Sequence, residues 1–130
     1  MINDAVSTVN LLGREYPLKL SVNAMEEIKS RFGDLDRAVG GLANTEDIFI
    51  RFKFAVSLVT ILADQGARAY CLEHPEAPAF PALTEEIVST ILDVKDIGAI
   101  MPKVISALND GMGREVFSMP EDNEKNSPGA

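Results

Sequence analysis

The sequence predicts an α+β fold that is mainly α, with an N-terminal β-hairpin packed on a bundle of about four helices. Two short β-rich stretches flank a glycine near the start of the chain, and apolar residues then recur at helical spacing. The chain has 130 residues, 46% of them hydrophobic and 25% charged, which is enough for one hydrophobic core but not for two. We therefore expect one domain over residues 1–113 and a flexible, disordered acidic tail over residues 114–130, where no large apolar side chain follows Pro120.

The expected hairpin comprises residues 7–12 and 15–20, which are rich in Val, Leu, Thr and Tyr. Between them lies Gly13-Arg14, and Gly13 can adopt the positive φ angle that a tight turn requires. Pro17 has no backbone N–H, so it restricts the second strand to an edge or to the end of the pairing. Because an isolated hairpin is marginal in water, this one must pack on helices.

Helix signals follow the hairpin. A helix is expected to begin after a cap within residues 21–23 and to end at Gly33, and a short turn at residues 35–39 should precede a break at Gly40-Gly41. Prolines mark residues 74–81 as a loop, and Thr84 with two following acids predicts the start of another helix.

The last expected helix extends from Asp96 to Leu108. Pro102 lies inside it and should kink or divide it, because proline removes one helical hydrogen bond. Gly111 and Gly113 are expected to end it.

The central segment, residues 48–63, allows two interpretations. Apolar residues alternate with Arg51 and Lys53, which is a strand pattern, but the apolar character continues without turn residues, which favours a helix. On a helix the polar positions form one narrow stripe: Lys53, Ser57, Thr60 and Asp64. A helix so apolar is either the centre of the core or carries a second face for a partner.

Residues on the margins of this apolar arc are the predicted partner-binding residues. One margin pairs Phe49 with Val56, and the other combines Ile50, Phe54 and Ile61. We predict that a partner binds Phe49, Phe54, Val56 and Ile61.

Charge and composition exclude several classes of function. Twenty acidic against twelve basic residues give a formal net charge of −8, which disfavours binding to nucleic-acid phosphates. The longest apolar stretch is interrupted by Arg51 and Lys53 and is shorter than the ~20 residues that span a bilayer. The first residues lack a signal-peptide pattern, and the single Cys71 cannot form an internal disulfide. We expect a cytosolic protein that binds neither nucleic acid nor membrane.

No catalytic, metal-binding or cofactor-binding constellation is evident. Cys71 and His74 have a spacing that two metal ligands could use, but no second Cys or His completes a zinc site, so a packed thiol at a helix end is the simpler interpretation. The glycine pairs lack the Lys-Ser or Lys-Thr of a phosphate-binding loop. We expect a binding protein rather than an enzyme.

Residues 9–20 (VNLLGREYPLKL) and 23–35 (NAMEEIKSRFGDL) together resemble the opening of the tail assembly chaperones of long-tailed bacteriophages and related prophages. Residues 83–88 (LTEEIV) and 107–112 (ALNDGM) are similar to the second half of those proteins. The resemblance covers about half of the chain in the expected order, and residues 45–71 carry no matching motif.

The resemblance implies a non-enzymatic chaperone in the host cytoplasm that shields the tape-measure protein before the tail tube polymerises around it. The tail tube protein and further copies of the chain are additional candidate partners. Such families often have a longer frameshifted product, and Glu124-Lys125-Asn126 can be encoded by an A-rich slippery run. The alternatives are a small structural tail or connector subunit of the virion, and a host adaptor or antitoxin-like protein.

Overall fold

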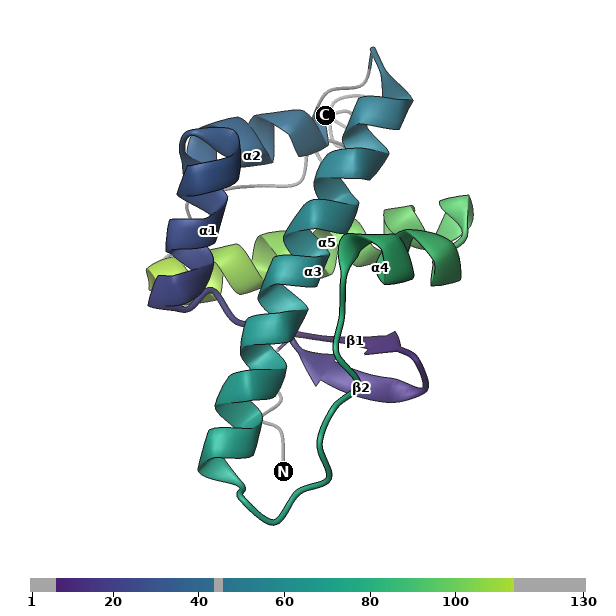
Figure 1. Cartoon of the computed structure of the whole chain (residues 1–130). Helices are drawn as coiled ribbons and strands as arrows, with labels where there is room; N and C mark the ends of the chain where they lie inside the picture. Colours follow the sequence, from purple (N-terminus) through teal and green to yellow (C-terminus); the bar gives the residue numbers. More distant parts are fainter. Residues whose placement is uncertain (1–6, 44–45, 114–130) are drawn as a thin grey trace, which may run out of the picture.

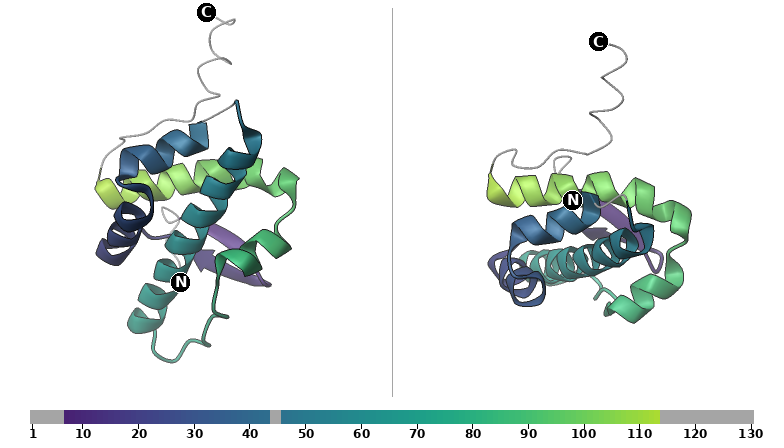
Figure 2. Two further views of the ribbon diagram at one scale, coloured as in Figure 1. Left: turned by 45° about the horizontal axis from the view of Figure 1, so that its top comes forward. Right: turned by 90° about the horizontal axis from the view of Figure 1, so that it is seen from above.

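In the computed structural model, residues 7–43 and 46–113 form a two-stranded antiparallel hairpin and five helices (Figure 1). The long helix α3, Ile48–Glu73, crosses α5, Val94–Met112, and is flanked by α1, Val22–Phe32, α2, Leu35–Ala43, and α4, Glu85–Ile91. Viewed from above, α5 forms one side of the molecule and α3 lies next to it (Figure 2). The predicted α+β, mainly helical class is confirmed. The predicted tail, residues 114–130, lies outside the described residues.

The hairpin pairs β1, Thr8–Leu11, with β2, Arg14–Pro17. Its turn is Leu12-Gly13, one residue earlier than predicted, and both residues have positive φ angles of 55° and 76°. Two positive φ angles are what a two-residue turn needs to match the twist of the strands. The predicted turn, Gly13-Arg14, was wrong by one residue. Leu12 occupies the first turn position, although leucine rarely adopts a positive φ angle. Pro17 lies at the end of the pairing, as predicted.

Helix α1 begins and ends where the sequence indicated. The Ser21 hydroxyl accepts a hydrogen bond from the Ala24 N–H (3.0 Å), and Gly33 follows the helix with a φ angle of 97°. Ser21 also donates to Gln65 Oε1 (2.6 Å), so the same cap fastens α1 to α3. The Ser21 side chain thereby accepts a hydrogen bond at the N-terminus of α1 and also holds α1 against α3.

Helix α2 continues through Gly40 and Gly41, so the predicted chain break at these glycines is wrong. A Cβ atom at Gly41 would lie 2.3 Å from the Phe54 ring, whereas one at Gly40 would meet nothing within 4 Å. Gly41 is therefore required by the close approach of α2 to α3, rather than by a helix end. Phe54 in turn stacks on Phe32, with 5.0 Å between the ring centroids.

The central segment is a helix and not a strand. Asp47 caps α3 by accepting hydrogen bonds from the backbone N–H groups of Phe49 and Ile50. The expected polar stripe is not fully solvated, since Ser57 and Thr60 are each 8% exposed. Thr60 tolerates this burial because its hydroxyl donates to the Val56 carbonyl (2.7 Å).

The hairpin packs directly on the second half of α3. A Cβ atom at Gly66 would lie 1.6 Å from the Pro17 carbonyl oxygen, so the strand backbone touches the helix backbone at this glycine. The Lys19 N–H donates to the Leu62 carbonyl (3.1 Å) beside it. The predicted packing of the hairpin on helices is observed. It depends on Gly66, for which we predicted no role from the sequence.

Helix α4 has the predicted start, whereas α5 begins at Val94, two residues before the predicted Asp96. Thr84 caps α4 by accepting from the Ile87 N–H (3.1 Å). Pro102 lies within one continuous helix α5, so the predicted division does not occur. The carbonyl that its missing N–H leaves free belongs to Gly98, and both residues are exposed, so water can satisfy it.

The C-terminal end of α5 also differs from the prediction at one glycine. Gly111 lies inside α5, where a Cβ atom would be 2.4 Å from the Leu20 Cβ atom. Gly113 ends the helix with a left-handed conformation (φ 79°), as predicted.

Candidate functional site

The first turn of α3 exposes three consecutive large apolar side chains, which we name the apolar helix start: Ile48, Phe49 and Ile50. Their exposed fractions are 57%, 65% and 37%. The Asp47 cap fixes the backbone of this turn, so the side chains are held on an ordered element. Lys53 places its ammonium group 5.6 Å from the centroid of the Phe49 ring. Adjacent exposed apolar residues of this size are typical of an interaction surface.

The four predicted partner-binding residues do not share one surface. Phe49 is exposed, whereas Phe54 and Val56 are half-buried and pack against the core. Ile61 is 7% exposed and belongs to the core, so it offers a partner almost no surface in this structure. The wide apolar arc of α3 is mainly core because α1, α2, α4, α5 and the hairpin all surround this helix. The first turn of α3, by contrast, is exposed.

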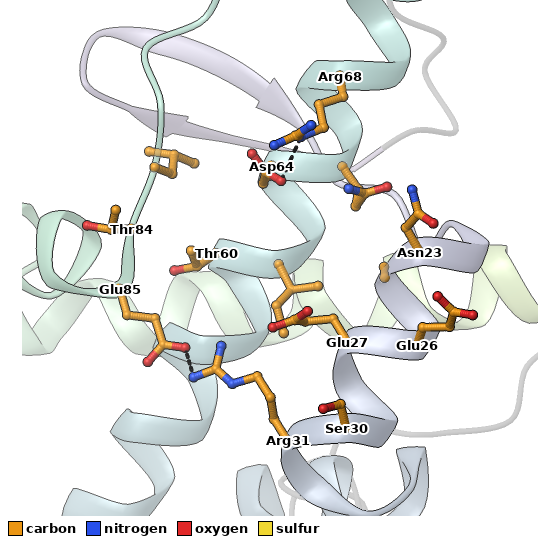
Figure 3. Close-up of a pocket in the computed structure, with 14 residues that line it drawn as sticks. Asn23, Glu26, Glu27, Ser30, Arg31, Thr60, Asp64, Arg68, Thr84 and Glu85 are labelled. Carbon is orange, nitrogen blue, oxygen red and sulfur yellow. Dashed lines mark hydrogen bonds and ion pairs between the residues drawn. The ribbon is translucent and has the colours of Figure 1, made fainter.

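A second feature is a polar groove of about 750 Å³ between α1, α3 and the start of α4 (Figure 3). Thr60 and Ile61 lie at its floor, and charged side chains form its walls. The labelled side chains come from these three parts of the chain: Asn23, Glu26, Glu27, Ser30, Arg31, Thr60, Asp64, Arg68, Thr84 and Glu85.

Two ion pairs cross or border the polar groove. Arg31 of α1 pairs with Glu85 of α4, which joins the two helices across the opening, and both side chains are about one-third exposed. Within α3, Arg68 pairs with Asp64 (3.0 Å). With Glu26 and Glu27, the walls carry four carboxylates against two guanidinium groups, so the groove has an excess of negative charge. Such pairs at the surface contribute little stability and are readily exchanged for other partners.

An unpredicted cluster joins the hairpin to the loop before α4. Arg14 donates to the carbonyls of Ala79 (2.7 Å) and Pro78 (3.2 Å), and its guanidinium lies 4.0 Å from the centroid of the Phe80 ring. Tyr16 is fully buried and donates its hydroxyl to the Pro81 carbonyl (2.7 Å). We call these contacts the loop clamp. Their signal in the sequence is weak, since it consists of alternate polar residues on one strand and one aromatic residue in a proline-rich loop.

Burial affects the acid–base chemistry of the loop clamp. It raises the pKa of the Tyr16 hydroxyl above its ordinary value of 10.0, and the positive charge of Arg14 offsets part of this effect. The phenol therefore remains a neutral hydrogen-bond donor at physiological pH.

Cys71 and His74 lie at the end of α3. The His74 ring stacks on Tyr70 at 4.2 Å between ring centroids, and its Nδ1 lies 3.1 Å from the Tyr70 carbonyl oxygen. Residues 7–43 and 46–113 contain no group of three or more His, Cys, Asp or Glu side chains that could hold a metal ion. Among the helices described, none is both long and apolar enough to cross a membrane.

Comparison with known proteins yields no match to a family model, a curated protein or a solved structure. Functional conclusions about this chain therefore rest on its own residues, and the apolar helix start is the best-defined candidate site.

Proposed function

We propose that this protein is a tail assembly chaperone that binds and shields a tape-measure protein in the host cytoplasm. The observation that carries the proposal is the apolar helix start, where Phe49 is 65% exposed between two further apolar side chains. The resemblance of residues 9–20, 23–35, 83–88 and 107–112 to such chaperones supports the choice of client.

The physical argument concerns reversible coverage. A tape-measure protein is long and helical, and its apolar stripes face water until the tail tube encloses them. An apolar helix start can lie against such a stripe, as in other complexes in which a helix packs into an apolar surface. The patch is small compared with a permanent interface, which suits a complex that must later dissociate. The net charge of −8 keeps the chaperone itself soluble at high concentration.

Co-expression tests the proposal. This protein, expressed with a tape-measure protein encoded beside it, should raise the soluble yield of the client, and the two should purify together. A matched culture expressing the tape-measure protein alone provides the reference yield. Equal yield in both cultures, without co-purification, would contradict the chaperone function.

A small structural tail or connector subunit of the virion is the second candidate. It is favoured by exposed apolar residues on other elements, such as Val22 on α1 and Val94 on α5, because a permanent assembly would bury several surfaces at once. Purified particles distinguish the two functions. A structural subunit remains in them in fixed stoichiometry, whereas a chaperone is absent.

A further inference from the structure

The chain between α3 and α5 passes the hairpin and includes α4 (Figure 1). We call this segment, residues 74–92, the strap. The structure describes all of its residues, and Val88 is the only one of them that is buried. Three further apolar side chains are half-buried against the core: Phe80, Leu83 and Leu92. Burial of apolar surface therefore contributes little to holding the strap on the domain.

The backbone of the strap is bonded to the rest of the fold at one place. The His74 N–H donates to the Tyr70 carbonyl (2.8 Å), where α3 ends. No other backbone pair joins the strap to the remainder of residues 7–43 and 46–113. Helix α4 has seven residues, and isolated helices shorter than about 12–15 residues are marginal in water. Helix α4 therefore depends on the docking of the strap.

Side chains of two other elements fasten the strap. In its first half, the loop clamp joins Arg14 and Tyr16 of the hairpin to carbonyl groups within residues 78–81. Further along, Arg31 of α1 pairs with Glu85 in the first turn of α4 (Figure 3). Water can replace such polar contacts, and an ion pair at the surface adds little stability. The strap is thus held mainly by contacts that can be broken and remade.

We propose that the strap opens as one unit, with hinges at its two ends, while the rest of the fold stays intact. Segments with few buried apolar contacts open more readily than the core, and they do so cooperatively. Leu83, Thr84 and Glu85 of the strap line the polar groove together with Thr60 and Ile61. Opening therefore widens the polar groove and uncovers more of Ile61, which is 7% exposed in this structure. This inference does not depend on the proposed chaperone function.

Amide hydrogen exchange of the full chain tests whether the strap opens separately. The Val88 and Leu92 amides report on the strap, since each donates to a carbonyl within it. The Leu62 amide lies in the buried middle of α3 and reports on unfolding of the whole domain. Relative to the rates of an unfolded chain, Val88 and Leu92 should exchange at least about tenfold faster than Leu62.

The variant Ile105→Val distinguishes opening of the strap from unfolding of the domain. Ile105 is buried in the second half of α5, outside the strap, and loss of one methyl group should accelerate exchange at Leu62 about two- to tenfold. Exchange at Val88 and Leu92 should change less than about twofold, because the open state keeps this part of the core. Equal acceleration at all three amides would overturn the proposal, since the strap would then open only with the whole domain.

The variant Tyr16→Phe tests whether the strap opens as one unit. It removes the hydrogen bond to Pro81, which lies outside α4. A concerted opening breaks this bond together with the contacts of α4, so exchange at Val88 and Leu92 should accelerate about fivefold.

Tyr70→Phe is the matched control for the lost hydroxyl. Within the described part of the chain the Tyr70 hydroxyl makes no hydrogen bond, so this variant should alter exchange at Val88 and Leu92 less than about twofold. Acceleration by Tyr16→Phe but not by Tyr70→Phe supports the proposal. Unchanged exchange at both amides in Tyr16→Phe would overturn it, because α4 would then unfold without the rest of the strap.

Discussion

Tyr16 links the hairpin to the loop before α4 through a single hydroxyl, and its replacement isolates that hydrogen bond. Tyr16→Phe keeps the ring against Phe80 and removes only the donor to Pro81. We expect a loss of about 1 kcal/mol in the free energy of unfolding, measured by urea denaturation at pH 7. An unchanged stability would show that water satisfies the Pro81 carbonyl equally well.

The same residue predicts a pH dependence. Burial raises the pKa of Tyr16 in the folded state above its ordinary value of 10.0. Its contribution to stability is therefore fully present below pH 10 and is lost as the pH rises toward the folded-state pKa. The free energy of unfolding should fall more steeply above pH 10 in the wild type than in Tyr16→Phe. Parallel curves for the two proteins would contradict this.

Gly40 and Gly41 are neighbours with opposite expected responses to alanine. Gly41→Ala should destabilise the fold by about 1–3 kcal/mol, because its Cβ atom would overlap the Phe54 ring. Gly40→Ala meets open space in a helix and should stabilise by about 0.5–1 kcal/mol. Thermal denaturation of the two variants decides the matter, and equal shifts would show that α2 does not pack closely on α3.

Sequence reasoning succeeded at the residues whose role is local. Ser21 and Thr84 cap helices as predicted, because a cap depends on the few residues that follow it. It failed at Gly41 and Gly111, where the need for glycine comes from a side chain distant in sequence. The sequence does not distinguish a glycine that ends a helix from a glycine that lets two elements pack closely, because the packing partner is distant in the sequence.

At the scale of single elements, α3 combines a structural and an exposed part. Phe54→Glu should destabilise the fold by about 2–4 kcal/mol, because Phe54 stacks on Phe32 and touches Gly41. Phe49→Glu should change stability by less than about 0.5 kcal/mol, since its ring is exposed. Chemical denaturation followed by circular dichroism measures both. A large loss for Phe49→Glu would place this residue in the core.

The helical character of α3 and its role as the centre of the core were predictable from its length and composition. The exposed residues of α3 were not predictable in the same way. Burial of Ile61 and Thr60 depends on α1, α4 and the hairpin, whose positions around α3 cannot be read from the periodicity of α3 itself. The same applies to the loop clamp, which joins residues more than sixty positions apart.

At the scale of the whole molecule, the end of the chain provides a further prediction. Deleting residues 120–130 should shift the melting temperature by less than about 2 °C, because these residues contain no large apolar side chain to bury. The calorimetric comparison uses the full chain as its reference. A larger loss would show that this polar segment docks on the domain.

The overall architecture was predictable because each element carries its own signal, whereas the polar groove was not. This groove is formed between elements, and its walls come from three separate parts of the chain. The partner surface on α3 stays a prediction, and which apolar residues of this helix are exposed followed only from the packing of the other helices.

Affinity for a tape-measure protein is the most direct test of the proposed function. The account predicts that the wild-type chain binds and that Phe49→Glu weakens binding at least about tenfold, because a charge replaces the most exposed part of the apolar helix start. Leu72→Glu is the matched control, since Leu72 is 82% exposed at the opposite end of the same helix, and it should leave the dissociation constant within about twofold of the wild-type value. Isothermal titration calorimetry with all three proteins gives the comparison. No binding by the wild type, or equal weakening by both variants, would contradict the account.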